Sequence, residues 1–295
     1  MKEKFDFYDK TSIKSYNLDE KIRYQLKILD SLDAFTRRHC ENVATITCRL
    51  CELLKMSEGF TIYCTTCAYL HDVGKMFIPP AVLQKPGKLT EEEYTIMKSH
   101  TTIGNEICMK DEKLRPYAAG ALFHHEALNG SGYPNGVKGN NIPYEAQIIR
   151  VADEYEAITS KRQYKSHIGI IETLNILIGN AKAGKIDKKI LKCLFKVVIE
   201  DTEFEICSRL DYLKYLKKEI KRMETAYKYY RKMEASITAS KKDYFYQYAK
   251  MYLKENEKVE IIPEMLNDLK NSYEKKAGTI NELYLEIRQI KHLVV

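Results

Sequence analysis

Histidine and aspartate residues recur in the first half of this 295-residue sequence in a pattern that could bind metal ions. Five of the seven histidines lie between residues 39 and 125, namely His39, His71, His100, His124 and His125. A single helical histidine is more often a core or surface residue than a ligand. Three of these five, however, belong to the adjacent pairs His71-Asp72 and His124-His125. Both pairs fall at or near predicted helix ends, where neighbouring side chains can converge on one ion.

The ligand types indicate which metals could bind. Imidazole and carboxylate together suit iron, manganese or zinc, whereas magnesium prefers oxygen alone. Five histidines with Asp72 and Asp153 exceed what one ion needs. The sequence therefore predicts a two-metal site in which a carboxylate bridges the ions and a water lies between them.

The cysteines offer a second candidate metal site. Cys48-x-x-Cys51 and Cys64-x-x-Cys67 have a spacing that could hold zinc through four thiolates. Both pairs lie in apolar helical runs without the glycine-rich turn that directs thiolates toward an ion. We interpret all four as small buried core residues, and all eight cysteines as reduced thiols.

The elements that must position these residues are helices, because apolar residues recur at helical spacing and alternating strand patterns are scarce. Thr90 followed by Glu93 predicts a capping box. Residues 129–143 hold four glycines, two prolines and four asparagines, which predicts a loop that serves a site. The fold class is all-α, with helices predicted near residues 19–30, 33–56, 59–72, 91–109, 114–126, 143–160, 169–182 and 187–200.

The composition changes near residue 203 to long helices rich in Lys, Glu and Tyr. These are typical of a helical hairpin or a short coiled-coil bundle. They form either a solvated appendage or a module that binds a second copy or a protein partner. We predict an N-terminal helical segment over residues 1–32, a catalytic domain over 33–202 and a C-terminal extension over 203–295.

Charge and hydropathy restrict the class of partner. The net charge of +7 is spread over residues 1–200 and 201–295 without a basic block, which disfavours duplex nucleic acid and leaves a small anionic substrate. No apolar stretch is long enough to cross a membrane, and the N-terminus lacks the features of a secretory signal. We expect a cytoplasmic protein with no membrane partner.

Several motifs in order resemble the HD-GYP family of the HD phosphohydrolase superfamily over about residues 33–200. They are His39, HDVGK at 71–75, KPGKLTEEE at 85–93, KSH ending at His100, HHE at 124–126, GSGYP at 130–134 and VADEYEAITSKRQYK at 151–165. The resemblance implies an HD-type helical bundle that hydrolyses cyclic di-GMP to linear pGpG and often onward to GMP, or that opens a related cyclic dinucleotide. The attacking hydroxide would bridge two divalent ions, iron or manganese.

The resemblance also implies roles for single residues. One ion would bind His39, His71, Asp72 and Asp153, and the other Asp72, His100, His124 and His125. Asp72 would bridge the ions and Lys75 would lie against the phosphate. Tyr133, Arg162 and Lys165 would contact substrate.

Three positions depart from the family pattern. Phe35 stands one helical turn before His39, where members with three metals have a glutamate, so we expect no third ion. Ala127 replaces a typical arginine, which removes an expected anchor of the loop, and Asn129 replaces a typical aspartate but keeps a turn-forming side chain. These changes affect the expected loop geometry and substrate affinity, not the metal ligands.

Two other functions stay open. The metals could serve a different phosphate ester or nucleotide, although such an enzyme would not need Tyr133, Arg162 and Lys165. The chain could instead be a catalytically weak regulatory protein that binds a cyclic dinucleotide, or docks a partner through the loop or the C-terminal helices. A complete set of costly buried ligands argues against this.

Overall fold

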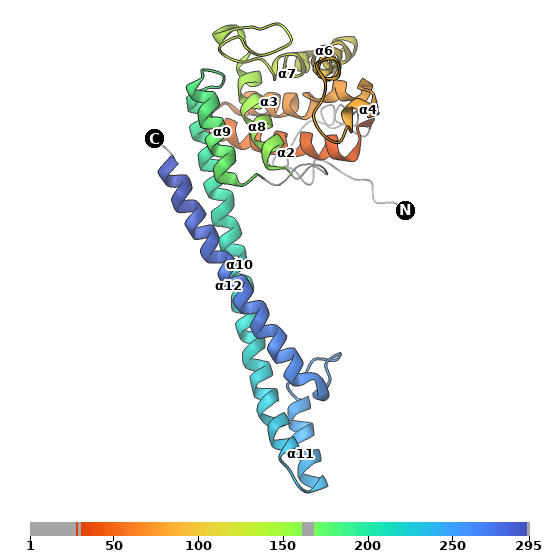
Figure 1. Cartoon of the computed structure of the whole chain (residues 1–295), viewed down its shortest axis with the longest axis vertical. Coiled ribbons are helices and arrows are strands. Elements are labelled where there is room, and N and C mark those ends of the chain that lie inside the picture. The colour runs from red at the N-terminus through yellow and green to blue at the C-terminus, as the bar shows by residue number, and fades with distance from the viewer. Residues whose placement is uncertain (1–27, 29–30, 161–167, 294–295) are drawn as a thin grey trace. The chain divides into compact units, whose positions relative to one another are not determined.

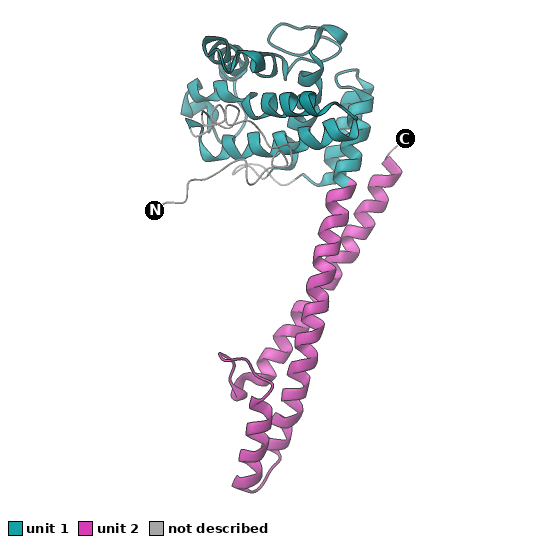
Figure 2. Ribbon diagram, turned by 180° about the vertical axis from the view of Figure 1, so that it is seen from behind, with its two compact units in different colours: residues 1–198, 294 teal, residues 199–293, 295 magenta. Residues whose placement is uncertain are grey.

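The computed structural model describes residues 28, 31–160 and 168–293. Within these ranges every regular element is a helix, which confirms the predicted all-α fold (Figure 1). The chain divides into two compact units that meet in sequence at residues 198 and 199 (Figure 2). The predicted boundary at residue 203 falls inside one long helix, and the three-part division stays a prediction. The helix predicted at residues 19–30 lies almost wholly outside the described residues.

Several helices of the first unit begin at side chains that cap backbone N–H groups. The Asp33 carboxylate accepts from the N–H groups of Phe35 and Thr36, both at 3.0 Å. The Thr90–Glu93 capping box is confirmed, with both reciprocal hydrogen bonds present. The elements are α2 (Ala34–Leu53), α3 (Glu58–Leu70), η4 (Val73–Phe77), α4 (Pro80–Leu83), α5 (Glu91–Lys98), α6 (His100–Lys110), η5 (Arg115–Tyr117), α7 (Ala118–Phe123), η6 (Gly139–Asn141), α8 (Tyr144–Thr159), α9 (Ile170–Lys182) and the start of α10 (Lys188–Glu234).

The single helix predicted over residues 91–109 is wrong, because the structure has two helices, α5 and α6, with Ser99 between them. The Ser99 backbone N–H and hydroxyl both donate to the Ile96 carbonyl oxygen, at 3.1 and 2.6 Å. They compete for the acceptor that the residue 100 N–H would use in a continuous α-helix. The break places His100 at the first position of α6.

The core of the first unit lies between helices α2, α3, α6, α7 and α8. Helix α2 packs against α3 and α8, while α6 packs against α7 and η4. Cys48, Cys51, Cys64 and Cys67 are fully buried, and no three of them converge as a ligand group within the described part of the chain. Their interpretation as core residues is confirmed.

Gly74 allows η4 to lie directly against α6. A Cβ atom at this position would stand 2.0 Å from the His100 carbonyl oxygen and 2.6 Å from the Gly104 nitrogen. Since both neighbours are backbone, the helices would have to separate. We expect Gly74→Ala to lower the free energy of unfolding by about 3 kcal/mol in chemical denaturation.

Gly59 in α3 provides the matched control for this substitution. A Cβ atom at Gly59 meets nothing within 4 Å. Gly59→Ala is therefore expected to leave stability unchanged or raise it by about 0.5 kcal/mol. Equal effects of the two substitutions would contradict the steric role of Gly74.

The second unit is built from long helices that form a hairpin. Helix α10 continues to Glu234 because its sequence contains no glycine or proline, and α11 (Ala239–Lys250), η7 (Val259–Ile261) and α12 (Ile262–Leu293) follow. Helices α10 and α12 bury Ile206 against Ile280 and Ile287. Among the described residues, none of the helices combines the length and apolar character that a membrane span requires.

Candidate metal centre

The seven predicted ligands come from five helices, and most stand at helix ends. His71 and Asp72 occupy the junction between α3 and η4, and His124 and His125 follow directly after α7. His39 and Asp153 lie inside α2 and α8, and His100 opens α6. The packing of these helices brings all seven side chains to one place.

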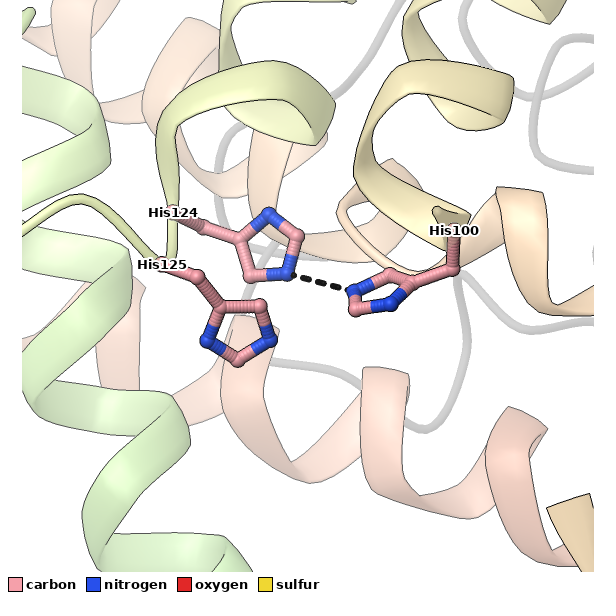
Figure 3. Close-up of side chains that lie close together, drawn as sticks. All are labelled: His100, His124 and His125. Atoms are coloured by element: carbon pink, nitrogen blue, oxygen red, sulfur yellow. Dashed lines mark hydrogen bonds between the residues drawn. The ribbon is translucent and has the colours of Figure 1, made fainter. Parts of the chain in front are cut away.

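The side chains form two donor groups. The imidazoles of His100, His124 and His125 make up one group, in which the donor atoms lie within 4.8 Å of one another. Figure 3 shows these rings side by side, with 3.2 Å between His100 Nε2 and His124 Nε2. The second group, His39, His71 and Asp153, meets the same distance limit. Either group could hold one divalent ion.

Asp72 lies between the two groups. Its Oδ2 is 3.4 Å from His39 Nε2 and 3.3 Å from His71 Nε2. Its Oδ1 is 3.3 Å from His100 Nε2 and 3.9 Å from His124 Nε2. One carboxylate oxygen therefore faces each group, which is the arrangement that a bridging ligand needs.

Backbone carbonyls fix three of the rings so that Nε2 points into the centre. His71 Nδ1 donates to the Ala68 oxygen at 2.6 Å, and His100 Nδ1 donates to the Met97 oxygen at 2.6 Å. His124 Nδ1 donates to the Ala121 oxygen at 2.9 Å. With Nδ1 protonated in this way, each Nε2 keeps a lone pair available for a metal ion.

Two buried atoms of the centre have no hydrogen-bond partner within the described residues. They are His71 Nε2 and Asp72 Oδ1, and their side chains are at most 1 % exposed. Leaving buried polar atoms unpaired is costly, and a divalent cation would satisfy both. The donor set of imidazole nitrogens and carboxylate oxygens therefore fits divalent iron, manganese or zinc.

The pKa values of the metal-free chain leave one group of histidines neutral. Burial lowers the pKa of His100 to about 4 and that of His125 to about 3. Burial, followed by the neighbouring His125, lowers the pKa of His124 well below its ordinary value. These rings need not release protons at neutral pH before they bind a cation.

The carboxylates of the centre stay ionised in spite of their burial. Burial raises the pKa of Asp72, but Lys75 and His71 lower it by more, so it lies well below its ordinary range. Burial likewise raises the pKa of Asp153, and His39 and His125 outweigh it. The centre therefore carries the negative charge that a divalent ion requires.

Of the remaining predicted site residues, the structure describes Lys75 and Tyr133 but not Arg162 and Lys165. The Lys75 ammonium forms a short ion pair with Asp72. The Tyr133 ring stacks on His125 with 4.7 Å between centroids and an interplanar angle of 28°. Arg162 and Lys165 lie outside the described residues, so their contacts stay predictions.

Phe35 stands exposed on α2, one turn before His39, and its ring offers no metal ligand. The count of two ions stays a prediction.

Ala127 has no side chain that could anchor the loop, but two residues to which the sequence analysis assigned no role hold it. The buried Glu126 carboxylate accepts from the backbone N–H groups of Asn135 and Val137, at 2.6 and 3.0 Å. Arg150 Nη1 donates to the carbonyl oxygens of His125 and Glu126, at 2.7 and 3.0 Å. The position of Arg150, one turn before Asp153 on α8, could have indicated this role.

Asn129 keeps the turn-forming function predicted for it. Its Oδ1 accepts from the Ser131 N–H at 3.0 Å, and its Nδ2 donates to the Ala183 oxygen at 3.0 Å. The start of the loop is thereby tied to the segment after α9.

Known proteins resemble this chain over the region that carries the centre. Residues 24–190, more than half of the chain, match the HD domain family. The chain belongs to the HD domain family. The resemblance drawn from the HD, HHE and GYP motifs is confirmed by this match and by the relatives that follow.

Curated relatives of this HD domain protein include three phosphodiesterases. A cyclic di-GMP phosphodiesterase of Thermotoga maritima is 40 % identical over 173 residues, covering 56 % of this chain and 47 % of the relative. A 3'3'-cGAMP-specific phosphodiesterase of Vibrio cholerae is 36 % identical, covering 52 % of this chain and 34 % of the relative. The cyclic di-GMP phosphodiesterase response regulator RpfG of Xanthomonas campestris is 40 % identical, covering 47 % of this chain and 37 % of the relative. The chain thus spans less than half the length of each.

Proposed function

We propose that this chain is a metal-dependent phosphodiesterase that hydrolyses cyclic di-GMP to pGpG, with or without a second hydrolysis to GMP, or that opens a related cyclic dinucleotide in the same way. The observation that carries the proposal is the pair of donor groups, buried except for the partly exposed His125, with Asp72 between them. The names of the relatives supply the substrate class, since they act on cyclic di-GMP or 3'3'-cGAMP.

In this proposal the ions are iron or manganese. One would bind His39, His71, Asp72 and Asp153, and the other Asp72, His100, His124 and His125. Divalent cations in such a site lower the pKa of water and neutralise negative charge that develops on phosphoryl oxygens.

The other residues of the site bind and orient the substrate. The Lys75 ammonium beside Asp72 would attract a phosphate oxygen. The half-buried Tyr133 ring on His125 would give a base an aromatic surface close to the metals. Arg162 and Lys165 would hold the second phosphate or a guanine.

In the same proposal, a second copy of the chain or a protein partner binds the loop or the C-terminal helices.

The direct test is to purify the full chain without oxygen, count its metals and follow cyclic di-GMP, pGpG and GMP by chromatography. We expect about two equivalents of iron or manganese and turnover to pGpG. Tight binding of cyclic di-GMP without turnover, whichever metal is supplied, would instead favour a regulatory protein.

The substrate contacts need a separate measurement. Arg162→Ala is expected to raise the Michaelis constant for cyclic di-GMP at least about tenfold, because a charged hydrogen-bond donor is lost. Hydrolysis of bis(p-nitrophenyl) phosphate, a phosphodiester without bases, should change little and controls for the metal centre. An unchanged Michaelis constant for cyclic di-GMP would remove Arg162 from the site.

A further inference from the structure

Glu156 is a buried carboxylate beside the centre that none of the ligand assignments uses. It lies on α8 one turn after Asp153, and it is 5 % exposed. One oxygen, Oε2, contacts His39 Nδ1 in a short hydrogen bond. The other oxygen, Oε1, accepts from Asn42 Nδ2 at 2.8 Å and from the Ser160 hydroxyl. Both oxygens therefore have partners.

Glu156 stands behind His39, on the side of the ring away from the metal ligands. His39 Nε2 faces Asp153 Oδ1 at 3.0 Å and Asp72 Oδ2 at 3.4 Å. Nδ1, on the opposite side of the ring, faces Glu156. Since the imidazole separates Glu156 from these carboxylates, Glu156 is not placed as a ligand, and its direct contact with the donor group is through His39.

His39 differs in this respect from the three histidines held by backbone. Nδ1 of His71, His100 and His124 donates to a neutral carbonyl oxygen. A carboxylate makes a stronger, charge-assisted hydrogen bond than a carbonyl. It also makes the opposite ring nitrogen a better electron donor to a metal, besides fixing the tautomer and the ring orientation.

The partners of Glu156 make this orientation rigid. Asn42 lies on α2 one turn after His39, and Ser160 follows the end of α8. Two donors hold Oε1, so Oε2 stays directed at His39. The packing of α2 against α8 is thus coupled to the direction of His39 Nε2.

We infer that Glu156 is a positioning residue that directs His39 and makes the group of His39, His71 and Asp153 bind its divalent ion more tightly than the group of His100, His124 and His125. The inference rests on the metal centre of the proposed function. Beyond that function, we infer that the two groups differ in affinity, so that one ion binds before the other, and that Glu156 causes this difference.

The test is a titration of the metal-free full chain with Mn²⁺, followed by calorimetry and by the electron paramagnetic resonance signal of free Mn²⁺. The unaltered chain should show two unequal binding steps. Glu156→Gln, which keeps the shape but removes the charge, should weaken the tighter step about 10- to 100-fold and leave the other unchanged. Ser160→Ala should weaken the same step by a smaller factor, because Oε1 keeps its bond from Asn42.

Glu145→Gln is the matched control. Glu145 lies on the same helix, is 9 % exposed and accepts a hydrogen bond from the Tyr63 hydroxyl at 2.9 Å. This substitution should leave both Mn²⁺ steps unchanged. Circular dichroism of each metal-free variant shows whether the helices are intact. If Glu156→Gln does not fold, Ser160→Ala decides the inference, and an unchanged tighter step in that variant overturns it.

The inference would be overturned by two equal steps in the unaltered chain, by equal weakening of both steps in Glu156→Gln, or by a tighter step that Glu156→Gln leaves unchanged. A chain that binds no Mn²⁺ would overturn the metal centre and this inference together. A chain that binds two ions unequally, with the expected effect of Glu156→Gln, but hydrolyses no cyclic dinucleotide would contradict the proposed function alone.

Discussion

Asp72→Ala is expected to remove both metal ions and to lower hydrolysis of cyclic di-GMP at least about a thousandfold. The reason is the position of its carboxylate, with Oδ2 near His39 and His71 and Oδ1 near His100. Loss of this residue takes one ligand from each of the two proposed ions at once. Metal analysis of the purified variant and chromatography of its products measure the two effects.

Asp153→Asn is the matched comparison for Asp72→Ala. Asp153 belongs to the group of His39 and His71, and the three histidines of the other group remain. We expect this variant to lose about one equivalent of metal and keep the other, while its hydrolysis also falls. If Asp72→Ala loses only one ion, Asp72 belongs to a single site and does not bridge; if it keeps both, the assignment is wrong.

Arg150→Ala is expected to destabilise the first unit by about 3 kcal/mol, because it removes the cation beside the mostly buried Glu154 carboxylate and leaves it the hydrogen bond from the neutral Asn180 amide. The Arg150 and Glu154 side chains are 14 % and 19 % exposed, and their ion pair is 2.6 Å long. For a unit of this size the loss corresponds to a fall of about 6–12 °C in the melting temperature. Differential scanning calorimetry measures it.

Arg150→Ala should also lower the catalytic activity of the site. Arg150 binds the carbonyl oxygen of His125, which in turn accepts from the Tyr133 N–H at 3.2 Å. Without the guanidinium, the backbone that carries His125 and Tyr133 loses its link to α8. We expect hydrolysis of cyclic di-GMP to fall at least about tenfold at a temperature where the variant is folded.

Arg209→Ala tests whether these effects follow from burial. Arg209 and Glu205 form the same kind of pair four residues apart on α10, but their side chains are 32 % and 49 % exposed. A pair this exposed contributes at most about 1 kcal/mol, and it lies in the other unit. Equal melting temperatures for the two variants would refute the anchoring role of Arg150.

Much of the fold could be predicted because its causes are local in the chain. Helical spacing of apolar residues predicted the all-α class, and Thr90 with Glu93 predicted a helix start that the structure has. The break at Ser99 could not be predicted in the same way. It depends on the Ser99 hydroxyl, which competes for the Ile96 carbonyl oxygen. The spacing of apolar residues carries no information about this hydrogen bond.

The sequence by itself determined the family, the helical class and the types of ligand available, because motifs, periodicity and residue chemistry are properties of the chain order. Only the tertiary structure decided that Asp72 faces both donor groups, that Glu156 stands behind His39, and that Arg150 holds the loop despite Ala127. These contacts join residues on different helices. Their geometry depends on how α2, α3, α6, α7 and α8 pack, so no local pattern could encode it.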